Sequence, residues 1–344
     1  MFPNSSLEMP NRNSADHNNT NQDCLAREST TQAEIVFKAL AYFIILLVSL
    51  VGNLLILSIT YRNKQLRKSI NFFVFNMAVS DLFNPLTIMP IQIVHIISGS
   101  DSWNVDNPRM LGNILCKLCY FLPDVSLIVS IESLLLISMD RFVAAIFPLC
   151  TKLESLKARS ISILCIWIVA IAVHAPYFYT FSLKVNPRDN KTYCKSSWRP
   201  AFDHVETNKR FVTATFITFI LVPICVFAIV YGTIARVLKK KNTQLKQQLS
   251  YRQRYQEHQL RKIVRMSVAL IISFIVCLIP QLSFLFARIF LWNWEEPAIC
   301  SFRTVIPFIA MFMMHSWSAV NPCVCLISNK IYFNSFRKIL HLSK

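Results

Sequence analysis

Seven long runs of apolar residues, separated by polar segments, dominate the pattern of the chain. The runs cover residues 35–61, 70–97, 113–139, 160–181, 211–238, 263–290 and 302–327. Each run has about 20 residues or more, which is the length that a helix needs to cross the hydrocarbon core of a bilayer. The pattern therefore predicts an all-α membrane protein, a bundle of seven transmembrane helices.

The chain divides into three parts. Residues 1–34 are polar and rich in Asn and Ser, without the apolar stretch of a cleavable signal peptide, so we expect a disordered extracellular tail. Residues 35–328 form the membrane domain. In residues 329–344, apolar positions recur at helical spacing beside basic residues, which predicts a short amphipathic helix on the membrane surface. Its apolar face would carry Ile331, Phe336, Ile339 and Leu340.

The two longest connections between spans differ in composition. Lys239–Arg261 contains neither Gly nor Pro, which predicts helical extensions of spans 5 and 6. Leu183–Arg210 is charged and predicts a long loop on the other side of the membrane. The chain shows no internal repeat, which disfavours a transporter built from inverted repeats.

Composition and charge narrow the class of protein. Hydrophobic residues make up 54% of the chain and charged residues 16%, which excludes a soluble enzyme, a secreted disulfide scaffold and a disordered protein. The net charge of +18 would suit nucleic acid, but Lys and Arg concentrate in the segments after spans 1, 3, 5 and 7. The positive-inside rule then places the N-terminus outside and the C-terminus in the cytosol, with the bilayer rather than nucleic acid as a partner.

Three N-glycosylation sequons agree with this orientation. They begin at Asn4, Asn18 and Asn190, and all fall on the predicted outer face. We therefore expect a glycosylated, multi-pass protein of the plasma membrane.

A few polar side chains lie at membrane depth, where they are costly unless they find partners. Asp124 and Glu132 in span 3 are two of them, and interhelical hydrogen bonding is the ordinary role of such groups. One further set is large enough to form a hydrated cluster whose oxygens suit a hard cation such as sodium. It comprises Asn53, Asp81, Ser130, Ser318 and Asn321. An allosteric sodium ion near Asp81 is the only cofactor or metal that we expect.

Asp140 and Arg141 form a neighbouring acid–base pair near the inner end of span 3. Two interpretations stay open. The pair either anchors the helix at the interface, or acts as a lock in which Asp140 holds Arg141 at rest and releases it to a partner. Arginine suits the second role because it stays charged and offers a planar fork of donors.

Prolines inside the spans predict kinked helices, because a proline removes one backbone hydrogen bond and leaves a carbonyl without its partner. They are Pro90, Pro176, Pro223, Pro280 and Pro322. Kinked helices favour a ligand cavity and rigid-body motion over a passive membrane anchor.

Four of the 11 cysteines fall on the predicted outer face, where disulfides form. Cys24, Cys116, Cys194 and Cys300 allow three pairings. A Cys116–Cys194 bond would pin the long outer loop across the cavity, and a Cys24–Cys300 bond would tie the tail to the last outer loop. The sequence leaves these alternatives open.

From Ile35 to Leu340, the chain resembles the rhodopsin-like, or class A, G-protein-coupled receptors, because these and further residues match the motifs of that family in order. Each motif alone is weak, but so many in order at the right spacing are very specific. The motifs are Gly52-Asn53, Asp81, Trp103, Cys116, Asp140-Arg141-Phe142, Pro148, Trp167, Cys194, Pro223, Tyr231, Phe274, Cys277-Leu278-Ile279-Pro280 and Asn321-Pro322.

The resemblance implies a receptor that couples to a heterotrimeric G protein, and not an enzyme. The residues it implies for G-protein coupling are Asp140, Arg141, Phe142, Pro148, Tyr231, Lys239, Arg261 and Lys262. Those it implies for the activation switch are Phe274, Leu278, Pro280, Trp317, Asn321, Pro322 and Cys325. Four residues follow Leu340, with Ser343 as their one phosphoacceptor, so arrestin recruitment through the tail should be weak.

Within the family, the chain is most similar to peptide receptors of the tachykinin, neuropeptide Y and galanin type. Pro123 stands where amine receptors carry an aspartate, and His315 stands where opsins carry the retinal lysine. Neither an amine nor retinal is therefore expected, and the long charged outer loop suits a large polar ligand. We expect a neuropeptide to contact Gln92, Pro123, Asp124, Trp198, Arg288 and His315.

Two residues depart from the family pattern. Leu278 stands where the family usually has Trp, and Cys325 stands where it usually has Tyr. One hypothesis is that Trp317 lies near Leu278 and supplies the missing bulk. The other hypothesis is weakened or altered G-protein signalling, and the two departures also leave a non-signalling decoy receptor open. Separately, a lipid ligand is the alternative to a peptide within the receptor class. A transporter or channel is less favoured.

Overall fold

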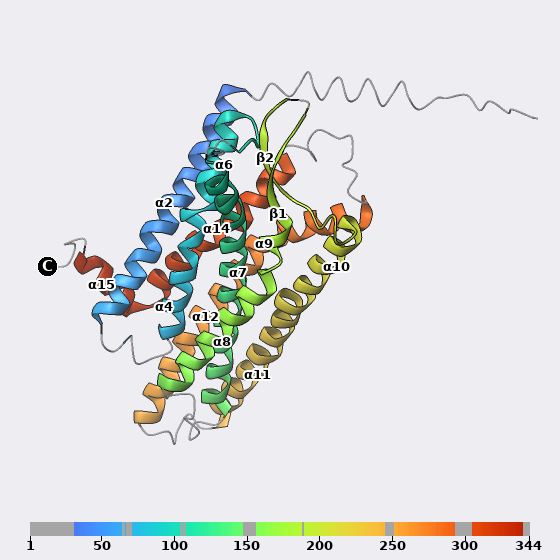
Figure 1. The fold of residues 1–344 in the computed structure, drawn as a ribbon. Helices are drawn as coiled ribbons and strands as arrows, with labels where there is room; N and C mark the ends of the chain where they lie inside the picture. The colour runs from blue at the N-terminus through green and yellow to red at the C-terminus, as the bar shows by residue number, and fades with distance from the viewer. Residues whose placement is uncertain are drawn as a thin grey trace, which may run out of the picture.

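The computed structural model describes residues 31–63, 66, 71–103, 105, 108–146, 156–187, 189–244, 251–292 and 305–339. This part of the chain contains seven helices that are long and apolar enough to cross a membrane, as the sequence predicts. They form one elongated bundle with a β-hairpin at one end and the short helix α15 toward the other (Figure 1). We call these the hairpin end and the α15 end.

Six of the spans lie close to their predicted positions, and several extend beyond them. The helices that form them are α2 (Gln32–Arg62), α7 (Arg109–Ile146), α8 (Leu156–His174), α10 (His204–Phe216), α11 (Val222–Gln244), α12 (Tyr251–Phe286) and α14 (Val305–Ser328). Two five-residue π-helical segments, η2 (Ile217–Leu221) and η3 (Ala287–Leu291), continue the fifth and sixth spans. The helical extensions predicted on either side of the connection between spans 5 and 6 are present in α11 and α12.

The second span is broken into three pieces, α4 (Asn71–Asp81), α5 (Phe83–Leu86) and α6 (Ile88–Ser98). Each of the first two pieces ends four residues before a proline, Pro85 or Pro90. Because proline has no N–H group, the carbonyl four residues earlier loses its helical partner. The kink expected at Pro90 is therefore present, and Pro85, which the sequence analysis did not single out, adds a second one.

Two boundaries differ from the sequence prediction. α8 ends at His174, so Pro176 ends this helix instead of kinking it, and a single turn, α9 (Tyr177–Thr180), follows. α10 begins at His204 because the Asp203 side chain caps it, accepting a 2.9 Å hydrogen bond from the backbone N–H of Glu206. The last seven residues of the predicted loop 183–210 are therefore helical.

The remaining connection between spans 4 and 5 carries the hairpin. β1 (Phe181–Val185) and β2 (Thr192–Ser196) pair antiparallel, with Leu183 opposite Cys194. Asn190, the one predicted glycosylation site within the described residues, lies exposed in the turn between the strands. Asn4 and Asn18 lie outside the described part of the chain.

α15 (Lys330–Ile339) is attached to the bundle by an aromatic side chain. Tyr332 is fully buried, and its hydroxyl lies 3.0 Å from the Thr60 hydroxyl of α2. Of the face predicted to be apolar, Phe336 packs against the core, whereas Ile331 and Ile339 are 38% and 39% exposed. Those two side chains suit contact with the bilayer surface.

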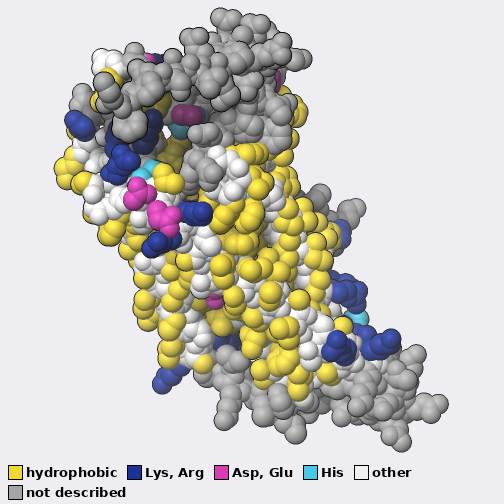
Figure 2. Space-filling model, turned by 90° about the vertical axis from the view of Figure 1, so that its right-hand side faces the viewer, with side chains coloured by type: hydrophobic (Ala, Val, Ile, Leu, Met, Phe, Trp, Pro, Cys, Tyr) yellow, Lys and Arg dark blue, Asp and Glu magenta, His cyan; other side chains and the backbone are white. Residues whose placement is uncertain are grey.

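Hydrophobic side chains cover most of the side of the bundle that Figure 2 shows, and most of the charged side chains visible there lie toward its two ends. Phe37 on α2 and Ile229 on α11, for example, are 69% and 68% exposed. Such exposure would be unfavourable in water and is expected in lipid. Inside, α4, α7 and α8 are tied by a polar relay in which the Trp167 indole donates to Asn76 (2.9 Å) and Asn76 donates to Ser133 (3.0 Å).

Gly52 lets α2 and α14 approach closely, because a Cβ atom at this position would lie 2.7 Å from Cγ of Pro322. Gly52→Ala should therefore destabilise the bundle by about 1–3 kcal/mol, the usual cost of overpacking. Thermal unfolding of the purified protein measures it. Gly232→Ala is the matched control, since its added Cβ would meet nothing within 4 Å. Equal melting temperatures for the two variants would contradict this account.

Candidate functional site

A polar network at mid-membrane depth joins three spans through Asp81, which is fully buried. One carboxylate oxygen accepts a 2.8 Å hydrogen bond from the Ser130 hydroxyl on α7. The other accepts a 2.9 Å bond from the side-chain amide of Asn321 on α14. The Ser80 hydroxyl lies 3.3 Å from that of Ser130 and extends the network on α4.

The other two residues of the predicted sodium cluster belong to a separate network. The Asn53 amide donates to the backbone carbonyls of Ser318 (3.0 Å) and Ser49 (2.8 Å). The Ser318 carbonyl is the one that Pro322 deprives of its helical partner, so Asn53 satisfies a backbone acceptor that the proline leaves free. Hydrogen bonds to α14 and to Ser49 thus occupy Asn53 and Ser318, and the sequence analysis missed Ser49.

The residues around Asp81 fit a small hard cation in part. A sodium ion prefers oxygen ligands, and the Asp81 carboxylate with the Ser130 and Ser80 hydroxyls would supply them. Asn321 instead turns its N–H group to the carboxylate. Within the described residues there is no group of three or more His, Cys, Asp or Glu that suits a transition metal.

Asp140 and Arg141 form an ion pair near the α15 end of α7, with side chains only 12% and 17% exposed. Among the described residues, Nε of Arg141 has no hydrogen-bond partner although it is buried. Arg141 is therefore held by one acid and has donor capacity left. Phe142 packs on a cluster from α7 and α11 that includes Ala145 and Ile234.

The remaining residues predicted for G-protein coupling lie on the helices next to α7. The Tyr231 hydroxyl of α11 lies 3.0 Å from that of Ser138, one helical turn before Arg141. Lys239 is exposed near the end of α11, and Arg261 and Lys262 are half-buried on α12. Pro148 lies outside the described residues.

Four of the seven predicted activation residues belong to the large apolar core of the bundle, namely Phe274, Leu278, Trp317 and Cys325. The rings of Phe274 and Trp317 meet edge to face with centroids 5.4 Å apart. Leu278 is 3% exposed and belongs to the same cluster as Trp317. That Trp317 supplies the bulk missing at Leu278 stays a prediction. Cys325 is a buried free thiol in this cluster. Pro280 lies within α12 and Pro322 within α14.

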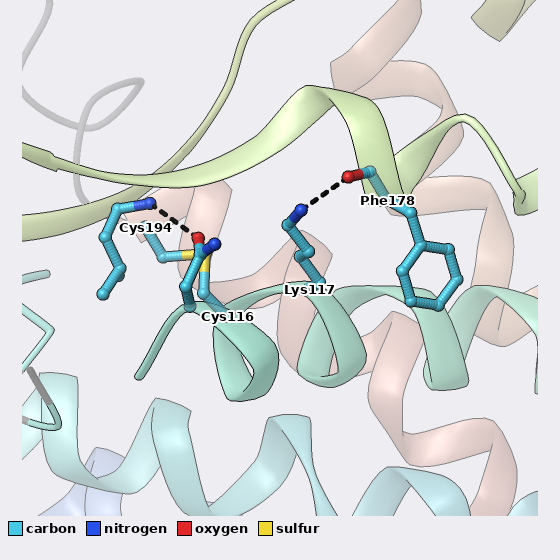
Figure 3. The surroundings of a disulfide bond; sticks show 6 residues. Cys116, Lys117, Phe178 and Cys194 are labelled. Atoms are coloured by element: carbon cyan, nitrogen blue, oxygen red, sulfur yellow. Dashed lines mark hydrogen bonds between the residues drawn. A yellow bond between two sulfur atoms is a disulfide. The ribbon is translucent and has the colours of Figure 1, made fainter. Parts of the chain in front are cut away.

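Three bonds hold the hairpin connection across the end of α7 (Figure 3). Cys116 and Cys194 form a disulfide with Cα atoms 5.6 Å apart, which decides among the pairings that the sequence left open. The Leu183 N–H donates to the Asn113 side chain (3.3 Å), and the Lys117 ammonium donates to the Phe178 carbonyl (2.6 Å). Cys24 and Cys300 lie outside the described residues.

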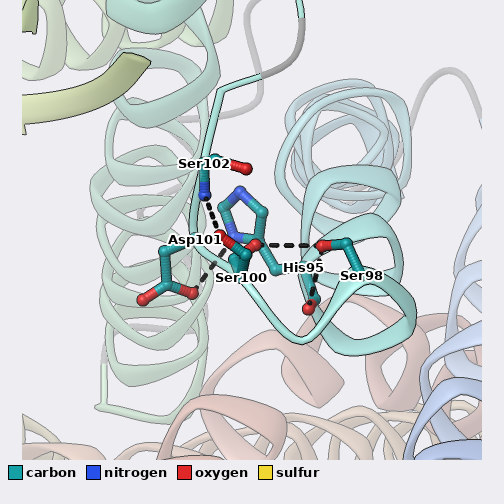
Figure 4. Close-up of polar contacts among 5 residues, drawn as sticks. All are labelled: His95, Ser98, Ser100, Asp101 and Ser102. Atoms are coloured by element: carbon teal, nitrogen blue, oxygen red, sulfur yellow. Dashed lines mark hydrogen bonds and ion pairs between the residues drawn. The ribbon is translucent and has the colours of Figure 1, made fainter. Parts of the chain in front are cut away.

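Polar contacts hold the turn that follows α6 (Figure 4). Gly99 ends α6 in the left-handed region with φ of 60°, and Ser98 then donates to the Ser100 carbonyl (3.0 Å). The His95 ring lies 3.7 Å from the Asp101 carboxylate, a contact that the sequence analysis did not anticipate. The turn leads to Trp103, whose backbone N–H donates to the Thr192 carbonyl of β2 (2.7 Å).

Several residues predicted to contact a ligand already have partners within the protein. Asp124 accepts a 2.6 Å hydrogen bond from the Tyr177 hydroxyl. Nδ1 of His315 lies 3.2 Å from the Tyr42 hydroxyl, and His315 is only 2% exposed. Trp198 packs on Phe211 of α10 with ring centroids 5.6 Å apart. Buried polar groups normally find partners nearby, which sequence reasoning could not foresee.

The other three predicted contacts lie on different helices. Gln92 on α6 is half-buried, and Pro123 is buried inside α7. The Arg288 guanidinium on η3 lies over the Phe284 ring at 5.9 Å. These three residues therefore come from separate elements, and joint contact of the six residues with a ligand stays a prediction.

Three side chains that the sequence analysis missed are better candidates for polar ligand contacts. Nδ2 of Asn84, Oγ1 of Thr213 and Oε1 of Gln281 are buried and have no hydrogen-bond partner within the described residues. They come from α5, α10 and α12. Asn84 lies at the middle of its span, and Thr213 and Gln281 lie in the halves of their spans nearer the hairpin end. A buried polar atom without a partner marks a place where a ligand or water completes the hydrogen bond.

Glu132 on α7 is half-buried within the membrane span, and among the described residues it has no hydrogen-bond or ion-pair partner. Because an unpaired carboxyl group is costly in hydrocarbon, Glu132→Leu should stabilise the protein by about 1–2 kcal/mol. The melting temperature would then rise by about 2–5 °C. Glu206→Leu is the control, because Glu206 is exposed and paired with Arg210 at 2.8 Å. A lower melting temperature for Glu132→Leu would reveal a partner for this acid.

Comparison with known proteins agrees with this geometry. Residues 52–324 match the family model described as 7 transmembrane receptor (rhodopsin family). The chain is similar to neuropeptide FF receptor 2 of Rattus norvegicus, with 25% identity over 313 residues, covering 86% of this chain and 70% of that protein. It is also similar to neuropeptide Y receptor type 1 of Xenopus laevis, with 26% identity over 308 residues, covering 87% of this chain and 77% of that protein.

Proposed function

This chain belongs to the rhodopsin family of seven-transmembrane receptors, and from that premise we propose that it binds an extracellular peptide and activates a heterotrimeric G protein. The observation that carries the proposal is the ion pair of Asp140 with Arg141 near the α15 end of α7. The pair holds the Arg141 guanidinium, which has a donor left unused, where a partner protein can reach it. Members of this family are receptors and not enzymes, so no catalytic residue is assigned.

The orientation follows from charge. The hairpin end faces the outside of the plasma membrane and the α15 end faces the cytosol, because the Lys and Arg excess lies in the connections and tail on the α15 side. The glycosylation sequon at Asn190 is then on the outer face, where glycans are added.

Features of the hairpin end of the bundle, where a ligand would enter, support a peptide ligand. The relatives named above are receptors for neuropeptides by name. The hairpin, tied to α7 by the Cys116–Cys194 bond, covers that end. Beneath it, the unpartnered polar atoms of Asn84, Thr213 and Gln281 would receive backbone or side-chain groups of the peptide.

A negative charge at the hairpin also supports a peptide ligand. The hydroxyl of Tyr193 and the backbone N–H of Lys191 donate to Asp189 and hold the pKa of that carboxyl group below its usual value. Asp189 is therefore ionised at neutral pH and can meet a basic residue of the peptide. The amidated and basic peptides are the first candidates.

Activation is a shift between two arrangements of the bundle. A peptide that binds the active arrangement more tightly moves the population toward it. The ends of α11 and α12 near the cytosol then separate, and Arg141 exchanges Asp140 for the C-terminal helix of a G-protein α subunit. Lys239, Arg261 and Lys262 border the same opening.

The sodium ion proposed near Asp81 would stabilise the resting arrangement. At ten times its dissociation constant, a bound ion contributes about 1.4 kcal/mol, so the melting temperature should rise by about 2–4 °C when sodium replaces choline. Asp81→Asn should remove this difference, because the ion loses its charged ligand. Asn53→Ala is the control that should keep it, since Asn53 bonds to α14 and Ser49 instead. A sodium effect that survives in Asp81→Asn would refute the site.

A screen of amidated and free-acid neuropeptides, with G-protein dissociation as the readout, tests the proposed function. A peptide that triggers dissociation in cells expressing this chain, and not in cells without it, would support it. The alternative is a decoy receptor, favoured by Leu278 and Cys325. Saturable peptide binding without G-protein dissociation, with surface expression confirmed, would establish the decoy and overturn the coupling half of the proposal.

Arrestin recruitment through the tail stays an expectation, because Ser343 lies outside the described residues.

A further inference from the structure

An apolar slot opens between α11 and α12 over the middle of α7. It is lined by twelve residues, all of them Ile, Leu, Phe or Pro. The slot is separate from the polar network around Asp81 and from the unpartnered atoms near the hairpin end. Its chemistry excludes an ion, a peptide backbone or a lipid headgroup, because no side chain there can pair with a polar group.

The slot has a buried floor and an exposed mouth. Ile131 and Leu134 on α7 are 3% and 1% exposed and form the floor, together with Leu278, which is 3% exposed. Ile279 at the mouth is 53% exposed, and Ile224 across from it is half-buried. The mouth is continuous with the lipid-facing belt of the bundle, where Ile272 is 55% exposed.

The backbone arrangement explains why the space exists. α11 and α12 both pack extensively on α7 but make few contacts with each other within the described residues. Leu278 fills less volume than the Trp that usually stands there in the family. The π-helical segment η2 contributes Ile220 to the lining, and such segments locally widen a helix.

We propose that the slot binds one acyl chain of a bilayer phospholipid. An empty apolar space forfeits dispersion contacts and does not hold water, so a hydrocarbon chain entering from the adjacent bilayer is the occupant that its shape and chemistry favour. The chain would lie against Leu278 and Phe274, which links its occupancy to the residues assigned to activation. The proposal depends on the membrane placement of the bundle and not on the proposed peptide or G protein.

Photolabelling of the full chain in phosphatidylcholine nanodiscs tests the proposal. The lipid carries a diazirine in the middle of one acyl chain, and the adducts are located by mass spectrometry. Adducts on Ile131 or Leu134 are expected, because a probe can reach these floor residues only through the slot. Adducts confined to exposed residues such as Ile229 and Ile272 would overturn the proposal.

Two substitutions fill the slot from opposite sides. Leu278→Trp acts from α12 and Ile224→Trp from α11, and each should lower labelling of the floor about tenfold, which corresponds to about 1.4 kcal/mol. Ile229→Trp is the control, because Ile229 is 68% exposed on α11 and does not line the slot. Labelling of Ile272 reports that each variant is folded and embedded. Undiminished floor labelling in a folded Leu278→Trp or Ile224→Trp variant would refute the site.

Discussion

Arg141→Ala is expected to abolish G-protein activation while leaving surface expression and ligand affinity close to those of the native protein. The side chain lies near the α15 end of α7, 17% exposed, with Asp140 as its ion-pair partner. It is far along the helix from Cys116 and the hairpin, so its loss should not disturb the ligand end. Only the group that receives the G protein would be missing.

The size of the effect follows from the chemistry of the side chain. Truncating an arginine that pairs with charged or carbonyl groups in a desolvated interface typically costs about 2–5 kcal/mol, a loss of at least thirtyfold in coupling affinity. G-protein dissociation and ligand binding, measured on the same cells, separate the two functions. Arg141→Lys keeps the charge but loses the planar fork, so it should retain partial coupling.

Asp140→Asn provides the opposite test. Neutralising the acid weakens its hold on Arg141, so basal G-protein activation should rise without ligand. If Arg141→Ala retained full coupling, or Asp140→Asn left basal activity unchanged, the pair would be an interfacial anchor for the helix and not a lock.

Cys194→Ser is expected to cost the protein most of its ligand affinity and a large part of its stability. The disulfide joins β2 to α7 across 78 residues of chain. Closing a loop of that length contributes about 2–4 kcal/mol in measured proteins. The hairpin would keep the Asn113–Leu183 and Lys117–Phe178 hydrogen bonds, so it should loosen rather than leave the bundle.

Thermal unfolding and ligand binding measure these two consequences. The double variant Cys116→Ser/Cys194→Ser should match each single variant, because either substitution breaks the same bond. Cys225→Ser is the control, since Cys225 is an exposed free thiol on α11. Native ligand affinity in Cys194→Ser would show that the hairpin keeps its position without the disulfide.

The fold was largely predictable from the sequence because the bilayer imposes one simple requirement. Each span must be long, apolar and internally hydrogen-bonded, so runs of apolar residues determine where the helices lie. The Asp140–Arg141 pair was equally visible, because adjacent residues need no tertiary contact to meet. The break at Pro90 followed from the missing N–H of that residue alone.

The sites were less predictable because they depend on which groups meet across helices. The sequence analysis predicted Asn53 and Ser318 in the sodium cluster. In the structure, Asn53 donates to the Ser318 carbonyl, which lacks its helical partner because of Pro322, and the Ser318 hydroxyl accepts from Ser49. His315 and Asp124 are paired with Tyr42 and Tyr177, which are distant in sequence. The pattern of apolar and polar residues along the chain does not indicate such partners.

The sequence by itself therefore determined the number of spans and their approximate limits, since both depend on local composition and on the membrane, and charge supports the proposed orientation. The tertiary structure alone decided the Cys116–Cys194 pairing, the unpartnered atoms of Asn84, Thr213 and Gln281, and the slot between α11 and α12. Those features arise from how helices pack against one another, and small changes in side-chain volume, such as Leu278 in place of a larger residue, alter them without altering the pattern along the chain.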